Sequence, residues 1–275
     1  MGRREVLDLL ASHGIRPSRA LGQNFVADAN TVRRIARMAG VGPGDDVVEI
    51  GAGLGALTMA LAETGARVKA VEVDRHLLPA LHEVVGGQPN IEVVHDDARL
   101  LDWNAVLAGA DRWVLVANLP YNVATPLVLD LLEGVPAISR MLVMVQLEVG
   151  QRLAAGVGDA AYGAPSVRVA YWATASVAGR VPATVFVPKP RVESALVQIE
   201  RLPVPAVDVP YAELSALVRA GFGQRRKMLR RALAGVVSVD AIEAAGIDPS
   251  ARAEELDIAA WGRLTACASN TLPPS

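Results

Sequence analysis

Apolar runs alternate with segments of helical periodicity through the middle of the chain. Each run is five to seven residues long, which is typical of strands in a parallel sheet. The runs cover residues 46–50, 67–73, 91–95, 113–117 and 141–147. Helical segments separate them, and one of these covers residues 124–133. Because strands that alternate with helices imply a parallel sheet with right-handed crossovers, the pattern predicts an α/β fold.

The same patterns predict further elements on either side of this series. Helices are expected near residues 3–13 and 28–39, the second ending at Gly40. Residues 175–180 and 195–200 are expected to form two more strands, a pair that could close one edge of the sheet.

After residue 201 the strand pattern stops. Residues 202–210 hold three prolines and are expected to form a linker. Beyond them apolar residues recur at helical spacing, and short helices are expected near 239–245 and 256–268. The helical series begins with Tyr211, Leu214, Val218 and Phe222 and resumes with Leu229, Leu233 and Val236. We therefore expect a sheet domain over residues 1–201 and a small helical domain over 211–275.

Composition and charge narrow the class of protein. With 52% hydrophobic and 20% charged residues the chain is typical of a soluble globular protein, and no apolar run approaches the ~20 residues that span a bilayer. The N-terminus lacks a signal-peptide pattern, so a cytoplasmic protein is expected. A monomer is expected as well. The single cysteine, Cys267, excludes an internal disulfide, and the four histidines show no metal-ligand spacing, so no metal site is expected.

Asn118, Leu119, Pro120 and Tyr121 follow the fourth apolar run, where open α/β sheets place their ligands. An Asn side-chain oxygen and a backbone carbonyl can accept the two N–H bonds of an exocyclic amine. Tyr121 can stack on its base, and Pro120 adds no donor to the turn. These residue types favour a site for an adenine N6 amine. The alternative is an ordinary strand end followed by a Pro turn.

Acidic and glycine residues follow the other expected strands. Gly51, Gly53 and Gly55 allow close backbone approach to a ligand at the start of a helix. Glu72 could accept both ribose hydroxyls of an adenosyl group, and Asp97 could accept from its adenine N6. The ribose contact would serve a dinucleotide equally well, and a single acid at a strand end is more often a helix cap. Together, these strand ends predict one cleft for a nucleotide-like cofactor.

The net charge of −2 and pI near 6.1 argue against nucleic-acid binding by the whole surface, so such binding requires local basic patches. The first forty residues hold seven arginines against three acids. Residues 219–231 hold six basic residues and no acid. On a helix, Arg226 with Arg230 and Lys227 with Arg231 would share one face, where like charges repel. A polyanion would compensate; the alternative is a solvated helix face. The candidate phosphate contacts are Arg225, Arg226, Lys227, Arg230 and Arg231.

A proline-flanked loop at residues 186–194 contains one of only three phenylalanines, Phe186. A ring held in such a loop is a candidate second stacking surface for a base flipped out of its helix. The alternative is that the ring plugs the core beneath the loop.

Taken together, these motifs resemble those of the ribosomal RNA adenine N6-dimethyltransferases, most closely the small-subunit branch. The matching segments keep the family's order and span residues 16–257. They are LGQNFV (21–26), VEIGAGLG (48–55), VEVD (71–74), DA (97–98), NLPY (118–121), FVPKPRVES (186–194), FGQRRK (222–227) and RAEELD (252–257). Ala52 departs from the pattern, since many relatives carry Pro there.

The resemblance implies a Rossmann-like domain that binds S-adenosylmethionine (SAM), followed by a small helical domain that binds ribosomal RNA. It implies dimethylation of two adjacent adenines in a hairpin loop near the 3′ end of 16S rRNA, within the immature 30S subunit. By motif match, Asn24, Val26, Gly51, Glu72, Asp97 and Asn118 would contact SAM, with Gly53 in the same loop. Residues 118–121 would hold the target amine, and Phe186 would stack on the adenine.

Three other functions stay open at this point. The chain could methylate 23S rRNA, as the resistance-type branch does, although its NLPY motif and basic segment resemble the small-subunit branch. It could be chiefly an RNA-binding assembly factor for the 30S subunit, with methylation secondary. An NAD-dependent dehydrogenase is weakly supported, because the glycine spacing is wrong and nothing supplies a hydride-site acid or base.

Overall fold

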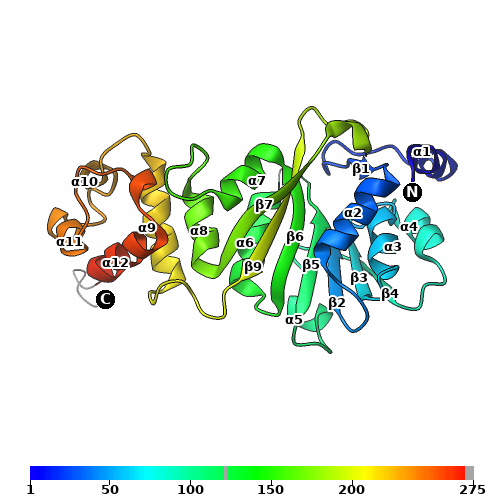
Figure 1. Cartoon of the computed structure of the whole chain (residues 1–275), viewed down its shortest axis with the longest axis horizontal. Coiled ribbons are helices and arrows are strands. Elements are labelled where there is room, and N and C mark those ends of the chain that lie inside the picture. The colour runs from blue at the N-terminus through cyan, green and yellow to red at the C-terminus, as the bar shows by residue number, and fades with distance from the viewer. Residues whose placement is uncertain (121–122, 270–275) are drawn as a thin grey trace. The chain divides into compact units, whose positions relative to one another are not determined.

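The computed structural model of the chain describes residues 1–120 and 123–269 (Figure 1). The chain forms two compact units. The first consists of Met1–Gly150 and Ser176–Glu200. The second consists of Gln151–Ala175 and Arg201–Ser275, described as far as residue 269. Within the described residues, no helix is long and apolar enough to cross a membrane.

A seven-stranded sheet organises the first unit, in the order β4-β3-β2-β5-β6-β9-β7. The first five strands in this order are parallel, and β9 runs antiparallel to β6. The strands are β2 (Asp46–Ile50), β3 (Arg67–Glu72), β4 (Ile91–His95), β5 (Trp113–Asn118), β6 (Ile138–Gln146), β7 (Ala173–Val181) and β9 (Ser194–Arg201). The predicted α/β fold is confirmed, and the two late strands do extend one edge of the sheet.

The strand order reverses between β2 and β5, because the chain adds β3 on one side of β2 and β5 on the other. The connections that follow the two strands at such a switch point run in opposite directions, which leaves a crevice for ligands outside the carboxyl ends of the strands. The glycine loop follows β2, and Asn118 ends β5. The topology therefore brings these two motifs, 63 residues apart in the chain, to one edge of the sheet.

Apolar packing holds helices against the sheet. Val47 on β2 and Val116 on β5 pack with Ile35 of α2 and Leu61 of α3 in one core, and all four are at most 2% exposed. Alternate residues such as Leu115 point to the opposite face and are also buried. The helices are α1 (Arg3–Ser12), α2 (Ala29–Ala39), α3 (Ala56–Ala62), α4 (Leu78–Val85), α5 (Trp103–Val106), α6 (Ala124–Gly134), α7 (Leu147–Ala154) and α8 (Ala164–Trp172).

The caps of α2 follow from its sequence. The carboxylate of Asp28 accepts hydrogen bonds from the backbone N–H groups of Asn30 and Thr31. At the other end Gly40 adopts a left-handed conformation with φ 57°, which glycine reaches without a Cβ penalty. The expected end at Gly40 is confirmed. After β3, the carboxylate of Asp74 accepts a hydrogen bond from the His76 N–H, and α4 begins at Leu78.

A two-stranded ribbon joins distant parts of the first unit. Strand β1 (Phe25–Val26) pairs antiparallel with β8 (Phe186–Val187), which follows the 3₁₀ turn η1 (Ala183–Val185). The ribbon brings the LGQNFV segment against the proline-flanked loop, although about 160 residues separate them. Arg3 of α1 donates from its guanidinium to the carbonyl of Phe186 at 3.5 Å.

The second unit is helical, with its own core around Trp261, which is fully buried. Gly221 lets α9 approach that indole, because a Cβ there would lie 2.7 Å from the ring. Tyr162 meets Phe222 edge to face with ring centroids 6.0 Å apart. The helices are α9 (Tyr211–Gly223), α10 (Leu229–Ala232), α11 (Val239–Ala244) and α12 (Ile258–Ser269), with a 3₁₀ turn η2 (Ala253–Glu255).

The division of the chain differs from the sequence expectation in two respects. Residues 151–175, expected in the sheet domain, belong to the compact unit that holds α9 to α12. The expected linker is also fixed within that unit: Leu202 N–H donates to the Trp172 carbonyl at 2.8 Å, and Tyr171 Oη donates to the Val209 carbonyl at 2.6 Å. Prolines stiffen a segment whether it is free or packed, so composition could not distinguish the two cases.

Candidate active site

Three adjoining cavities follow the carboxyl edge of the sheet, and Gly51 lines all of them. The first also contains Asp97, the second Glu72, and the third Glu49. Asn118 lines the second and the third. The cavities therefore form one groove, whose polar groups come in the order Asp97, Glu72, Asn118 and Glu49.

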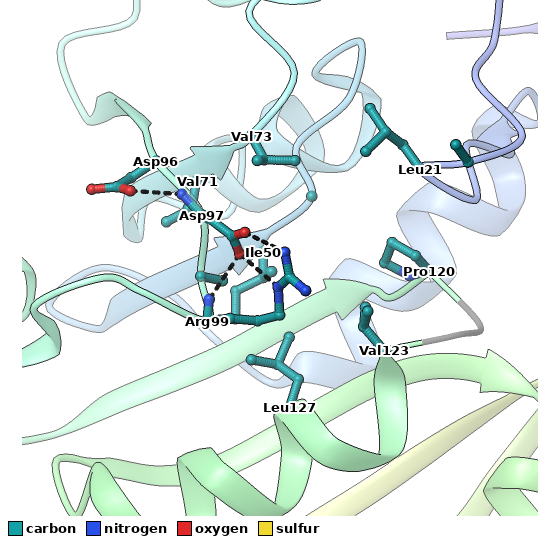
Figure 2. Close-up of a pocket in the computed structure, with 13 residues that line it drawn as sticks. Leu21, Ile50, Val71, Val73, Asp96, Asp97, Arg99, Pro120, Val123 and Leu127 are labelled. Carbon is teal, nitrogen blue, oxygen red and sulfur yellow. Dashed lines mark hydrogen bonds and ion pairs between the residues drawn. The ribbon is translucent and has the colours of Figure 1, made fainter.

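Apolar side chains wall the first cavity, and its charged end is an ion pair. Figure 2 shows Leu127 and Ile50 near Arg99, whose guanidinium forms an ion pair with Asp97. Asp97 Oδ1 accepts from Arg99 Nε at 3.0 Å, and Oδ2 accepts from the terminal nitrogen of the same guanidinium at 2.5 Å. These hydrogen bonds lower the pKa of Asp97, so the carboxylate is ionised at neutral pH. An apolar cavity that ends in a carboxylate suits an adenine with its N6–H₂ donor.

Glu72 in the second cavity is 5% exposed and ties the glycine loop to its own strand. Its Oε2 accepts from the Gly53 N–H and its Oε1 from the Asp74 N–H, both at 2.8 Å. Burial raises the pKa of this carboxyl, and the backbone hydrogen bonds oppose that rise. Each carboxylate oxygen can accept a second hydrogen bond, so the group can still receive two ribose hydroxyls.

The glycine loop passes close to β5. Gly51 has φ 78°, and a Cβ there would lie 3.5 Å from the Asn118 carbonyl oxygen. Gly53 has φ 59°, and a Cβ there would lie 3.2 Å from the ring of Phe25. Side chains at either position would be strained and would fill the groove that the loop borders, which fits a loop that cradles a ligand.

The LGQNFV segment closes the groove from the other side. Asn118 Nδ2 donates to the Asn24 carbonyl at 3.0 Å, and Asn24 lines the second cavity. Val26 lines the third cavity and is 7% exposed. In this arrangement Asn118 Oδ1 accepts no hydrogen bond from any residue that the structure describes, so this oxygen remains available to a ligand.

The turn after β5 is less rich in free acceptors than the sequence suggests. The Pro120 carbonyl already accepts from the Val123 N–H at 3.2 Å. Leu119 is 1% exposed, and its N–H donates to the Met144 carbonyl of β6. The Leu119 carbonyl is therefore the better second acceptor beside Asn118. Tyr121, expected to stack on a base, lies outside the described residues.

Phe186 does not form the surface that the sequence suggested. Its ring is 1% exposed and packs in the same core as Val26, Ile35 and Leu196. The pairing of β8 with β1 turns the side chain inward. The predicted stacking role is thus not supported in this conformation, and the alternative of a core plug agrees with the structure. Proline spacing alone could not tell an inward from an outward ring.

The basic segment also differs from the expectation. Residues 225–227 form a turn and not a helix, because α9 ends at Gly223 and Met228 pairs in an isolated β-bridge with Arg252. The expectation that Arg226 and Arg230, and likewise Lys227 and Arg231, repel each other on one helix face is therefore wrong. Arg225 is engaged within the unit, since its Nε donates to Glu254 at 2.6 Å. The other four candidate phosphate contacts are exposed: Arg226, Lys227, Arg230 and Arg231.

Two residues of the groove were not assigned a role from the sequence. Nothing in the sequence identifies Arg99 as a groove residue, because an arginine after the end of a strand is usually exposed to solvent. Glu49 does have a signal: it is an acid between two apolar residues of β2, two residues before the glycine loop. It is 1% exposed, and no residue in the described part of the chain forms a hydrogen bond with its Oε2. Burial raises its pKa from 4.5 to about 8.

The groove fits an adenosyl group with an amino-acid tail. Carboxylates stand where an adenine amine and two ribose hydroxyls would lie, and the orphan Glu49 oxygen marks a place for a further donor or cation. No set of three His, Cys, Asp or Glu side chains converges as a metal site in the part of the chain that the structure describes.

Comparison with known proteins assigns a family to this arrangement. The model of the family described as "Ribosomal RNA adenine dimethylase" matches residues 15–269. A protein of Kineococcus radiotolerans, "Ribosomal RNA small subunit methyltransferase A", is 49% identical over 275 residues, which cover 97% of this chain and 91% of that protein.

Two solved structures share the fold. The 23S rRNA methyltransferase ErmE is similar with a TM-score of 0.70 and 26% identity, over 90% of this chain and all of that one. A dimethyladenosine transferase from Plasmodium falciparum has a TM-score of 0.73 at 24% identity, over 86% of this chain and 94% of that one.

Proposed function

The chain belongs to the ribosomal RNA adenine dimethylase family, and from that premise we propose that it dimethylates N6 of two adjacent adenines in the 3′-terminal hairpin loop of 16S rRNA. SAM is the methyl donor, and the immature 30S subunit is the substrate. The observation that carries this proposal is the groove itself, in which acceptors for adenine, ribose and a target amine follow one another from Asp97 to Asn118.

Bound SAM supplies a methyl group on a cationic sulfur. The task of the protein is to hold the N6 amine in line with that methyl. Asn118 Oδ1 and the Leu119 carbonyl accept the two N6–H bonds, which orients the nitrogen lone pair toward the donor. Bound SAM would supply the methyl group along this line, and the N6 proton that is displaced would pass to water. Orientation of this kind supplies most of the rate, and no side chain is required as a strong base.

The small-subunit substrate is favoured over 23S rRNA by the relatives. The protein of Kineococcus radiotolerans shares nearly half of its residues with this chain and is named for the small subunit. ErmE shares 26%. Because both branches use one fold, the likeness to ErmE does not select a substrate.

The direct test is label transfer from radioactive SAM to RNA, followed by digestion to nucleosides. We expect label in N6,N6-dimethyladenosine when 30S subunits from an unmethylated strain are the substrate. Methylated 30S subunits and 23S rRNA run beside them should take up none. Label in 23S rRNA would assign the chain to the resistance-type branch. Tight binding of 30S subunits without label would favour the assembly-factor function.

We further propose that the exposed part of the basic segment holds RNA phosphates. The variant Arg226→Gln/Lys227→Gln should flatten the plot of log K against log salt for 30S binding by about 1 to 2, because each lost phosphate contact removes about 0.7 to 0.9 from the slope. Filter binding over a salt series measures it.

Arg112→Gln is the matched control, since Arg112 is exposed at the amino end of β5, away from the groove. Arg225→Gln should instead lower the melting temperature, because it breaks the pair with Glu254. An unchanged slope in the double variant would place the phosphate contacts elsewhere.

A further inference from the structure

Helix α2 carries three arginines to which the proposed function gives no role. Arg33 and Arg37 are exposed, and Arg34 is half-buried. The helix lies on one face of the sheet (Figure 1) and packs there through buried residues that include Val32 and Ile35. At 3.6 residues per turn, the three arginines fall within about 100° of the helix circumference, on the side opposite those buried residues. They therefore form one surface that faces solvent.

Backbone carbonyls hold two guanidinium groups at this surface. Arg34 Nη1 donates to the Arg180 carbonyl of β7 at 3.3 Å, and a Cβ on Gly179 would overlap the same guanidinium. Arg140 of β6 donates from Nη2 to the Gly40 carbonyl, at the end of α2, at 2.9 Å. A carbonyl fixes the position of a guanidinium without neutralising its charge. Because each guanidinium has five N–H donors, most of them stay available to another acceptor.

Four residues make up the α2 arginine face: Arg33, Arg34, Arg37 and Arg140. Among the residues that the structure describes, no acid forms an ion pair with any of them. Helix α2 itself contains no acid, and its N-cap Asp28 accepts from the first turn of the helix. Glu63, at the C-cap of α3, is exposed. Glu200, the register partner of Arg140 on β9, accepts from Gln198.

Local structure accounts for only part of this concentration of charge. Arg33 and Arg37 are four residues apart on the helix, where like charges repel. The partial negative charge at the end of a helix stabilises cations in the last turn, which includes Arg37 but not Arg33. A solvated face would leave four cations together, without a counter-charge, in a chain whose net charge is −2. A polyanion supplies that counter-charge.

We propose that the α2 arginine face is a second phosphate-binding surface, which contacts the backbone of 16S rRNA independently of the basic segment in the helical unit. This inference rests on the proposed function, because it takes the 30S subunit as the partner. Helix α2 begins three residues after Val26, which lines the groove. Nucleotides that flank an adenine in the groove therefore have α2 beside them. Guanidinium groups bind phosphate through paired N–H donors, and a row of them suits a row of phosphates.

Arg33→Gln/Arg37→Gln should reduce the slope of log K against log salt for 30S binding by about 1.4 to 1.8, because each lost phosphate contact removes about 0.7 to 0.9. Between about 50 and 200 mM salt, the native chain should therefore lose about tenfold more affinity than the variant. Filter binding to 30S subunits from an unmethylated strain measures both. Arg33→Lys/Arg37→Lys retains the charges and should retain the native slope.

The single variants Arg33→Gln and Arg37→Gln should each give about half of that change. Arg112→Gln is matched to them in charge and should give none. The reduction should also add to that of Arg226→Gln/Lys227→Gln, because the two surfaces lie in different units. A combined variant whose slope is no lower than that of either pair alone would contradict independent binding.

Salt dependence does not distinguish RNA from an acidic protein segment of the subunit, so the partner is identified by cleavage. Cys267 is the only cysteine, so Arg37→Cys in a Cys267→Ser background carries an iron–EDTA group at one place. Hydroxyl radicals from this position should cleave 16S rRNA within a short stretch that Arg112→Cys, in the same background, leaves intact. If Arg37→Cys gave no cleavage of the RNA, the partner would be a protein and the inference would be wrong.

The outcomes separate this inference from the proposed function. Both glutamine variants should keep the native melting temperature and the native affinity for S-adenosylhomocysteine, because the side chains at 33 and 37 are exposed and line no part of the groove. A native slope in Arg33→Gln/Arg37→Gln would overturn the inference, and label transfer to 30S subunits by the native chain would still support the function. A native chain that transfers no label but whose binding depends on these arginines would give the opposite result.

Discussion

Asn118→Ala is expected to lower the single-turnover rate of methyl transfer by about 10²- to 10³-fold at saturating SAM. Losing one preorganised polar group that acts on the reacting atoms has an effect of this size in other enzymes. Among the residues that the structure describes, none donates to Asn118 Oδ1, while Nδ2 donates to the Asn24 carbonyl at 3.0 Å. Alanine removes the acceptor and leaves the target amine free to rotate.

Cofactor affinity must be measured beside the rate, because Asn118 also anchors the LGQNFV segment. Loss of one neutral hydrogen bond is worth about 0.5 to 1.5 kcal/mol, so the Kd for S-adenosylhomocysteine should rise by about tenfold at most. Asn104→Ala is the matched control, since Asn104 is exposed on α5 outside the groove. A near-native rate for Asn118→Ala at saturating SAM would show that the amine is oriented by other groups.

Glu72→Ala should weaken cofactor binding most, with a Kd for S-adenosylhomocysteine about 10²- to 10³-fold higher. A hydrogen bond to a charged group contributes about 1.5 to 3 kcal/mol, and the carboxylate can receive two ribose hydroxyls. The same change removes the acceptors of the Gly53 and Asp74 N–H groups, so the glycine loop also loses its anchor. Calorimetric titration measures the affinity, and thermal unfolding measures the loss of the anchor.

Two further variants test whether the loss of affinity comes from the Glu72 carboxylate itself. Glu72→Gln keeps one acceptor oxygen and should lose less affinity than Glu72→Ala. Glu92→Gln should leave affinity unchanged, because Glu92 is an exposed acid on β4 that pairs with Lys69. If Glu72→Ala bound the cofactor as tightly as the native chain, the ribose would have to lie elsewhere in the groove.

Much of the site was predictable because parallel strands impose a simple geometry. Each polar residue that follows an apolar run must appear at the same edge of the sheet as the others. Gly51, Glu72, Asp97 and Asn118 were identified in this way, and all of them line the groove. Their convergence follows from strand direction alone and needs no knowledge of side-chain packing.

Predictions that depended on which side chains are buried were less accurate, and a specific contact explains each error. Phe186 is buried because β8 pairs with β1, a contact across about 160 residues that leaves no periodic signal. The basic residues 225–227 form a turn because Met228 pairs with Arg252. Segment 202–210 packs through backbone hydrogen bonds, which no residue type reveals.

The sequence by itself determined which segments form strands, that these strands run parallel, and which polar residues meet at the carboxyl edge of the sheet. These features depend on hydrophobic periodicity and on residues adjacent in the chain. The tertiary structure alone decided which groups are buried and which have partners. Arg99 lowers the pKa of Asp97, whereas burial raises the pKa of Glu49. The physical reason is that the protonation of a carboxyl depends on the atoms packed around it, and those atoms come from distant parts of the chain.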